Sequence, residues 1–295
     1  EKFAKHHSLP SSGDTPAMPA VKLEKIGRVA RILLNMPDKM NAMTSQLVDD
    51  FGKVLDTITN SSSEYGAVVI TGAGKSFSAG GDLAWLKLRS RDTASRNSQI
   101  MHDFYHRFLA IRSLPLPVVA AINGPAVGAG MCLAMACDIR VASQSAKLGF
   151  PFVSLGLHPG MGATHMIASV AGYETAYRLL LTGDLVNGQE AKELRLVSHV
   201  AADGPAAQAE AMQLAERIAA QAPVAVRSLV RSLRRKQEEG LEAALWREAD
   251  AQAHCYATRD LQEGLKASVE RRHPRFELNE SYADTDPPPK PKSSL

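Results

Sequence analysis

The sequence predicts an α/β fold, because strand-like and helix-like segments alternate along most of the chain. The series opens as β-β-α-β and continues with further short strands separated by helices, which favours strands joined by crossovers over an all-helical protein. From about residue 205 to 272 the pattern becomes wholly helical, with breaks at Pro223 and Gly240 and a stop at Pro274. We therefore expect an α/β body followed by a helical region.

The expected elements follow one another in a regular order. Strands are predicted, in chain order, at 21–26, 28–34, 67–71, 117–122, 138–142, 146–149 and 196–200. Helices are predicted between them at 44–59, 93–112, 128–137, 161–170, 173–181 and 188–194.

The two ends of the chain differ in composition from the part between them. Residues 1–20 have neither a helical nor a strand period and are predicted to be a disordered lead, or the stub of a processed presequence. We expect an α/β core over 21–204, the helical region over 205–278 and a proline-rich tail over 279–295. The chain ends in Ser293-Ser294-Leu295, which resembles a peroxisomal address, although Ser294 stands where that signal prefers a basic residue. A peroxisomal and a mitochondrial matrix location therefore both stay open.

The overall composition excludes several classes of protein. Of 295 residues, 45% are hydrophobic and 22% are charged, as in ordinary globular proteins. A net charge of +3 comes from 34 basic and 31 acidic residues and leaves no surface of a single sign, so we expect no nucleic-acid partner. No apolar stretch reaches the length of a membrane span. Three cysteines, Cys132, Cys137 and Cys255, make a disulfide framework improbable.

Three familiar motifs are absent or incomplete. A phosphate-binding loop at Gly74-Lys75 lacks its first glycine, because Val69 occupies that position. A dinucleotide fingerprint that starts at Gly128 lacks its third glycine, where Leu133 stands. His102 and His106 have the i, i+4 spacing of helical metal ligands, but the sequence indicates no third ligand, so we expect no metal site.

Two loops with almost no functional side chains remain. SAGGDL (78–83) and GPAVGAG (124–130) each follow an apolar strand and lead into a helical segment. Glycine and alanine allow a ligand to approach the backbone closely, and N–H groups at a helix N-terminus are unpaired and carry partial positive charge. Two such donors that converge would bind an oxyanion.

These loops belong to a set of motifs that resembles the crotonase (enoyl-CoA hydratase/isomerase) superfamily. The resemblance covers about residues 20–276 and is carried by PDKMNAM (37–43), ITGAGKSFSAGGDL (70–83), PVVAAINGPAVGAGMCLAMACDIRVAS (117–143), AKLGFPFVSLGLHPGMGAT (146–164) and LLLTGDLVNGQEAKELRLVSHV (179–200). It implies a crotonase-like spiral of β-β-α units with a C-terminal helical trimerisation region, and a homotrimer or homohexamer. It also implies acyl-CoA thioester substrates, with no cofactor beyond the coenzyme A of the substrate.

The resemblance assigns roles to particular residues. It implies that the backbone N–H groups of Gly81 and Ala129 form an oxyanion hole. Coenzyme A is expected to bind at these residues: Lys39, Met40 and Ala42 for the body of the cofactor, Ala79, Asp82 and Leu83 for the adenine, and Phe276 from the C-terminal region. Further substrate contacts are expected from Gly128, Cys132, Phe152 and Gly160.

The sequence departs from the family at its acidic positions. Hydratases of this family resemble one another in carrying two glutamates, and Cys132 and Phe152 stand at those positions here. Another branch uses an aspartate where this chain has Gly160. His158 and Cys132 are the remaining candidates for proton transfer. The imidazole of His158 could transfer a proton near neutral pH, although a hydrogen bond to the backbone before Pro159 is the favoured interpretation. Cys132 could act only as a thiolate, which its apolar helix disfavours, so packing is its favoured role.

Three hypotheses for the function follow. The first is an enoyl-CoA hydratase, which adds water to 2-enoyl-CoA in fatty-acid oxidation. The second is another crotonase-type enzyme, an enoyl-CoA isomerase or an acyl-CoA decarboxylase, whose chemistry needs less proton transfer from the protein. The third is a non-catalytic protein that binds acyl-CoA.

Overall fold

The computed structural model describes residues 18–277. Most of the predicted lead and the whole proline-rich tail, with the Ser293-Ser294-Leu295 signal, lie outside the described residues, so the location in the cell stays a prediction. Within residues 18–277, no helix is both long and apolar enough to cross a bilayer.

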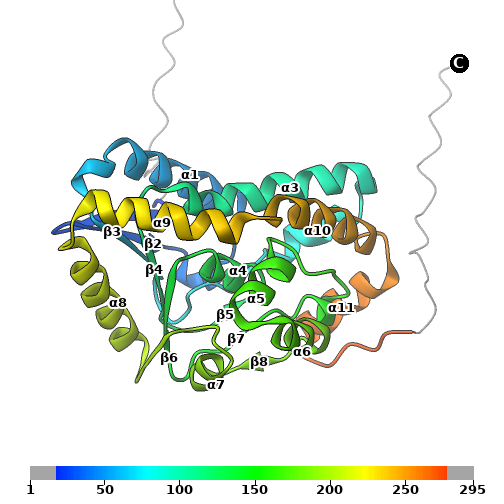
Figure 1. Cartoon of the computed structure of the whole chain (residues 1–295). Helices are drawn as coiled ribbons and strands as arrows, with labels where there is room; N and C mark the ends of the chain where they lie inside the picture. Colours follow the sequence, from blue (N-terminus) through cyan, green and yellow to red (C-terminus); the bar gives the residue numbers. More distant parts are fainter. Residues whose placement is uncertain (1–17, 278–295) are drawn as a thin grey trace, which may run out of the picture.

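A six-stranded sheet forms the centre of the body (Figure 1). Its strands lie in the order β1-β2-β3-β4-β6-β9. Their bounds are β1 Val21–Ile26, β2 Val29–Leu34, β3 Ala67–Gly72, β4 Val118–Ile122, β6 Ile139–Ser143 and β9 His199–Ala201. β1 and β2 pair antiparallel, and all the other pairs are parallel, as expected for strands joined by crossovers. A second sheet consists of β5 (Ala126–Val127), β7 (Leu148–Gly149) and β8 (Leu185–Val186).

Helices fill the crossovers. Their bounds are α1 Ser45–Asn60, α2 Leu83–Arg89, α3 Ala94–Leu109, α4 Ala129–Met135, α5 Ala163–Ala171, α6 Tyr173–Thr182 and α7 Gly188–Glu193, with short 3-10 turns η1 Pro37–Lys39, η2 Ser62–Glu64, η3 Ala110–Ser113 and η4 Val153–Leu155. α1 illustrates why these segments are helical: Thr44 caps its first turn, and Leu47, Phe51 and Ile58 bury one face at helical spacing. α4 is buried along its whole length, which explains its lack of polar residues.

The first C-terminal helix, α8 (Gly204–Ala219), covers one face of the main sheet. Four alanines at i, i+4 spacing, Ala207, Ala211, Ala215 and Ala219, are buried against the valines and alanines of β2, β3, β4 and β6. Their small side chains allow the helix axis to approach the sheet closely. The hydrophobic core therefore includes one face of α8.

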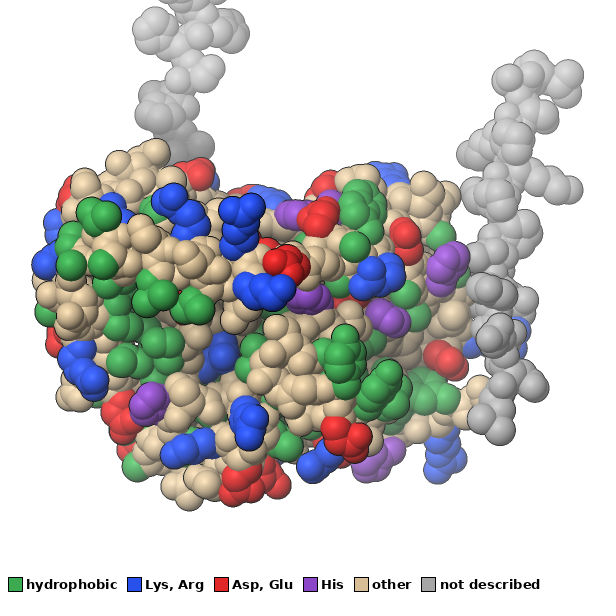
Figure 2. All heavy atoms as spheres, in the orientation of Figure 1, with side chains coloured by type: hydrophobic (Ala, Val, Ile, Leu, Met, Phe, Trp, Pro, Cys, Tyr) green, Lys and Arg blue, Asp and Glu red, His purple; other side chains and the backbone are tan. Residues whose placement is uncertain are grey.

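The remaining helices are α9 (Pro223–Glu238), α10 (Leu241–Cys255) and α11 (Arg259–Glu270). α10 runs along α3 (Figure 1). α11 lies against η4. α9 buries only Arg234 and exposes the apolar side chains of Val224, Leu229 and Leu233. On the face in Figure 2, acidic and basic side chains are interspersed, as the sequence charge predicts.

Candidate active site

The loop after β3 is tied to the loop before α4 by direct backbone contact. Val127 N–H donates to the Ser78 carbonyl over 3.0 Å, and the Ser78 hydroxyl donates to the Asn41 carbonyl over 2.8 Å. A Cβ on Gly80, which has φ +89°, would lie 2.4 Å from the Val127 carbonyl oxygen and 3.3 Å from the nitrogen of Ala129. Only glycine fits at this position, and it brings the two loops together.

The second loop has the same dependence on glycine. A Cβ on Gly130 would lie 2.4 Å from the Ser78 carbonyl oxygen. Gly128 precedes α4 with φ +56°, a backbone conformation that L side chains rarely adopt. The turn at Gly128 makes Ala129 the first residue of α4, which the sequence expects to start at residue 128.

The N–H groups of Gly81 and Ala129 are both unpaired. Ala129 opens α4, so its amide has no acceptor within the helix. Among the described residues, neither amide donates a hydrogen bond to another backbone or side-chain group. Ala129 is only 7% exposed, so its donor lies in a region with little access to water. Such a pair of donors suits an oxygen atom that gains negative charge.

The segment expected to bind coenzyme A lies beside the first of these loops. Ala79 N–H donates to the Met40 carbonyl over 2.9 Å, and Met43 N–H donates to the Gly80 carbonyl over 2.8 Å. The buried Asn41 side chain fixes the turn by bonding Met36, Ala73 and Ser76. The structure therefore brings Lys39, Met40 and Ala42 together with the residues expected near the adenine, and it leaves Lys39 and Met40 exposed.

Two of the expected adenine contacts sit at the start of α2. The Asp82 carboxylate accepts hydrogen bonds from the backbone of Ala84 and Trp85, so its present role is that of an N-cap. Leu83, the first residue of α2, is 38% exposed. Phe276 follows α11, which lies beside α2, and its side chain is 41% exposed. Its contact with coenzyme A stays a prediction.

The two positions that would hold the family's glutamates are apolar in the structure. Cys132 is fully buried, and burial raises the pKa of its thiol well above the usual value, so it is not a thiolate. The Phe152 ring lies 3.9 Å from the place of a Cβ on Gly128. An aspartate at Gly160 is excluded too, because a Cβ there would stand 2.2 Å from the Tyr105 hydroxyl.

Hydrogen bonds hold both the ring and the backbone of His158. Its Nδ1 lies 2.6 Å from the Pro159 carbonyl oxygen, its own N–H donates to Cys255 Sγ over 3.3 Å, and its carbonyl accepts from Gln252 over 2.9 Å. Burial lowers the pKa of the imidazole, although the bond to Pro159 opposes this. Because a carbonyl oxygen only accepts, we assign the proton of the neutral ring to Nδ1, which leaves Nε2 as the basic atom.

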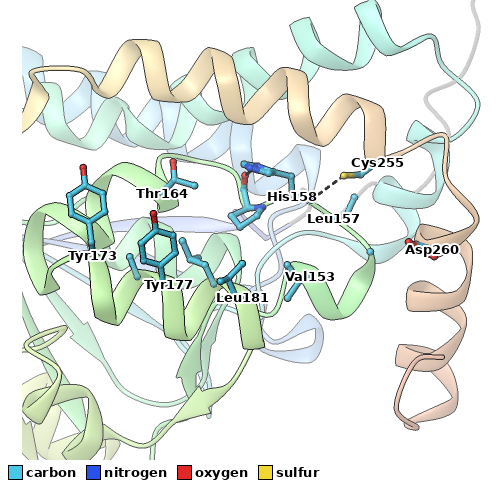
Figure 3. A pocket seen from close by; sticks show the side chains of 13 residues that line it. Val153, Leu157, His158, Thr164, Tyr173, Tyr177, Leu181, Cys255 and Asp260 are labelled. Atoms are coloured by element: carbon cyan, nitrogen blue, oxygen red, sulfur yellow. Dashed lines mark hydrogen bonds between the residues drawn. The ribbon is translucent and has the colours of Figure 1, made fainter. Parts of the chain in front are cut away.

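His158 borders a largely apolar cavity of about 590 Å³. Figure 3 shows Tyr173, Tyr177 and Leu181 from α6 on one side, Val153 and Asp260 on the other, and His158 below α10. Its volume is that of a small-molecule site.

The described residues that line this cavity do not include Gly81 or Ala129, so the oxyanion donors and the imidazole do not share it. Cys132 links the two regions, because its thiol donates to the Gly160 carbonyl over 3.5 Å.

A buried carboxylate that the sequence analysis does not single out lies behind this region. Glu248 of α10 is 1% exposed and accepts hydrogen bonds from the N–H groups of Gly162 and Thr164 and from the Thr164 hydroxyl, at 2.5–2.8 Å. It therefore caps α5 from another helix. The sequence did contain a signal, since Glu248 and Gln252 follow Ala244 at i, i+4 on the buried face of α10.

Titration of Glu248 should make the stability of the fold depend on pH. Burial raises the pKa of Glu248 to about 7, while the hydrogen bonds from Thr164 and Gly162 oppose the shift. The folded chain binds this proton more tightly than the unfolded chain does. Its contribution to the free energy of unfolding is therefore complete below the usual carboxyl pKa and is lost as pH rises through about 7. Glu248→Gln has no proton to lose at this position, so between pH 5 and pH 8 the free energy of unfolding of wild type should fall by about 2–3 kcal/mol more than that of the variant.

Urea denaturation of both proteins at the two pH values measures this difference. Glu210→Gln, at an exposed position of α8, is a matched control and should show the same pH slope as wild type. Equal pH slopes for wild type and Glu248→Gln would show that the carboxyl of Glu248 titrates as in the unfolded chain.

Comparison with known proteins identifies the family. The model of the enoyl-CoA hydratase/isomerase family matches residues 24–279. The short-chain-enoyl-CoA hydratase of Clostridium acetobutylicum is 36% identical over 85% of this chain and 95% of its own length. The crotonyl-CoA hydratase of Syntrophomonas wolfei is 34% identical over 86% of this chain and 96% of its own length. A solved enoyl-CoA hydratase/isomerase from Mycobacterium paratuberculosis superposes with a TM-score of 0.76 at 32% identity, over 86% of this chain and 99% of that one. The chain belongs to the enoyl-CoA hydratase/isomerase family, and its fold is that of the crotonase superfamily.

Proposed function

We propose that this protein binds 2-enoyl-CoA thioesters and adds water to their double bond, as an enoyl-CoA hydratase. The observation that carries the proposal is the pair of unpaired amides, Gly81 and Ala129, on two loops in backbone contact. The names of the relatives support the substrate class. No cofactor beyond the coenzyme A of the substrate is part of the proposal.

In this mechanism the thioester oxygen lies between the two amides. Addition of water to the β-carbon moves the electrons of the double bond towards that oxygen and forms an enolate, which the two donors stabilise more than the neutral carbonyl. The water oxygen loses one proton to solvent as its bond to the β-carbon forms. A proton from solvent then adds to the α-carbon, restores the carbonyl and completes hydration. Lys39, exposed beside the loop, would attract the phosphates of coenzyme A.

A hydration assay with crotonyl-CoA tests the proposal. At high enzyme concentration, purified protein should convert crotonyl-CoA to the 3-hydroxy product, seen as loss of the enoyl thioester absorbance. Calorimetric binding of a saturated acyl-CoA, measured in parallel, reports whether the site takes the thioester. Binding without turnover would contradict the hydratase assignment, and no binding would contradict the substrate class.

The apolar surroundings of Cys132 and Phe152 favour a second candidate within the same family. With no carboxylate at either position, the site stabilises an enolate better than it delivers a proton and a hydroxide. Decarboxylation of an acyl-CoA passes through a thioester enolate and needs one proton transfer, to the α-carbon. Isomerisation of an enoyl-CoA passes through a dienolate, and one group can both remove and return its proton. Assaying these substrates beside crotonyl-CoA separates the candidates by their relative kcat/KM.

In this second candidate, His158 carries the proton, which requires a substrate held at the oxyanion donors to reach the cavity that His158 borders. Loss of a general acid or base typically costs about 10²–10⁴-fold in rate, so His158→Ala should lower kcat by that factor. His158→Asn can still donate to the Pro159 carbonyl from the position of Nδ1 but cannot transfer a proton, and it should be equally slow. His165→Ala changes a half-buried histidine of α5 that does not line the cavity and should keep full activity. An unchanged kcat in His158→Asn would remove His158 from the mechanism.

We also propose that the chain assembles as a homotrimer or homohexamer. α9 leaves Val224, Leu229 and Leu233 between 59% and 79% exposed, a surface that a neighbouring subunit would cover. The mass in solution tests this, since each chain weighs 31.7 kDa.

A further inference from the structure

Two histidines of α3 and one glutamate of α10 direct their ligand atoms at one point. His102 Nε2 lies 2.9 Å from Glu242 Oε1, His106 Nε2 lies 3.1 Å from Glu242 Oε2, and the two Nε2 atoms are 3.1 Å apart. Glu242 is 140 residues from His102 in the chain. The structure therefore supplies a candidate third ligand, Glu242, that the sequence does not indicate.

These separations approach those in the coordination shell of a small divalent metal. Zinc binds imidazole nitrogen and carboxylate oxygen at about 2.0–2.2 Å, and in a tetrahedral shell this places neighbouring ligand atoms about 3.3–3.6 Å apart. The three distances in the cluster, 2.9–3.1 Å, are about 0.2–0.4 Å shorter than the lower end of this range, so a bound metal would move the three side chains apart only slightly. Two imidazoles and one carboxylate are also a ligand set that zinc uses when solvent fills its fourth position.

Hydrogen bonding alone satisfies this cluster poorly. Each Nε2 faces both a carboxylate oxygen and the other Nε2. If both nitrogens donate to Glu242, two N–H groups meet at 3.1 Å, and if one accepts from the other, it loses its bond to the carboxylate. A cation at the centre would accept a lone pair from all three groups.

The surroundings hold the ligands and leave the site accessible. The His102 side chain is 10% exposed and stacks on Trp246 of α10, with ring centroids 3.7 Å apart. His106 and Glu242 have side chains that are 46% and 60% exposed, so water can complete the coordination. Both also border a cleft of about 320 Å³ with Arg112 and Glu238.

We propose that His102, His106 and Glu242 form a binding site for one divalent transition metal, with zinc the best match to its ligands. The metal joins α3 to α10. The same two helices are joined deeper in the core by the 2.7 Å hydrogen bond from the Tyr105 hydroxyl to Gln252, which in turn bonds the His158 carbonyl. The bound metal therefore fixes the helix that supports the His158 loop. The site does not depend on the proposed hydratase activity.

Titration of tag-free, EDTA-treated protein with zinc sulfate tests the proposal. By calorimetry, the wild-type chain should bind one zinc ion, and cobalt should give the visible d–d bands of a nitrogen- and oxygen-ligated ion. Loss of an outer-shell partner already costs 10–100-fold in metal affinity, so His106→Ala and Glu242→Gln should each weaken binding by more than about 100-fold. His254→Ala removes an exposed histidine elsewhere on α10 and should bind zinc as wild type does.

His106→Ala and Glu242→Gln change exposed side chains, so the melting temperatures of these two variants in EDTA should equal that of wild type. Zinc should raise the melting temperature of wild type and of His254→Ala only. No zinc binding by the wild-type chain, or binding that persists in both His106→Ala and Glu242→Gln, would overturn the proposal.

Discussion

Replacing Ala129 with proline should lower kcat about 10²–10³-fold, the usual cost of losing one oxyanion donor. Proline has no N–H, and its ring would also occupy the space in front of the missing donor. The fold should tolerate the change, because Ala129 is the first residue of α4, where proline is favoured and no intrahelical hydrogen bond is lost.

The assay uses whichever acyl-CoA reaction the wild-type protein catalyses best. Ala129→Ser keeps the N–H group and serves as the matched control, with activity close to wild type. Circular dichroism and acyl-CoA binding of Ala129→Pro show whether fold and site survive. Full activity in a folded Ala129→Pro protein would contradict the assignment of this amide to the oxyanion hole.

Replacing Arg234 with alanine should lower the free energy of unfolding by about 3–5 kcal/mol, the cost of breaking a buried ion pair from one side. The Arg234 side chain is 6% exposed and is bidentate to the Asp138 carboxylate, at 2.8 and 2.5 Å. It also donates to the carbonyls of Arg112, Leu114 and Leu116 at 2.6–2.9 Å. Its removal leaves a carboxylate and three carbonyls without these donors.

Urea denaturation of Arg234→Ala measures the loss, with Arg235→Ala as the control. Arg235 is the next residue of α9 and is exposed, so its replacement should change stability by no more than about 0.5 kcal/mol. A similar small change for Arg234→Ala would show that α9 is held by other contacts.

Local pattern predicted the order of elements well. The apolar runs at 67–71 and 117–122 are β3 and β4, and the helical pattern at 44–59 is α1 within one residue. These segments could be predicted because period and length are set by neighbours in the chain. The loops around Gly81 and Ala129 were also evident, because only glycine and alanine allow their close backbone approach.

What the sequence could not indicate is which residues meet across long separations. Glu242 has the pattern of an ordinary exposed helix residue, and the spacing of Glu248 indicates a buried face without indicating a partner. Only the packing of α10 on α3 and α5 brings Glu248 to α5 and Glu242 to the two histidines. α8 likewise carries a regular alanine stripe, but the pattern does not say whether a sheet or another subunit covers it.

The position of α8 has a consequence for the biosynthesis of the protein. The sheet face that carries Val69, Val119 and Val141 is covered by a helix that is translated after all six strands. A nascent chain that has released its strands from the ribosome therefore still exposes a valine-rich surface, and such surfaces promote aggregation. Cotranslational folding of this body cannot finish before Ala219 has emerged, so the period of exposure is set by the rate of translation through α8.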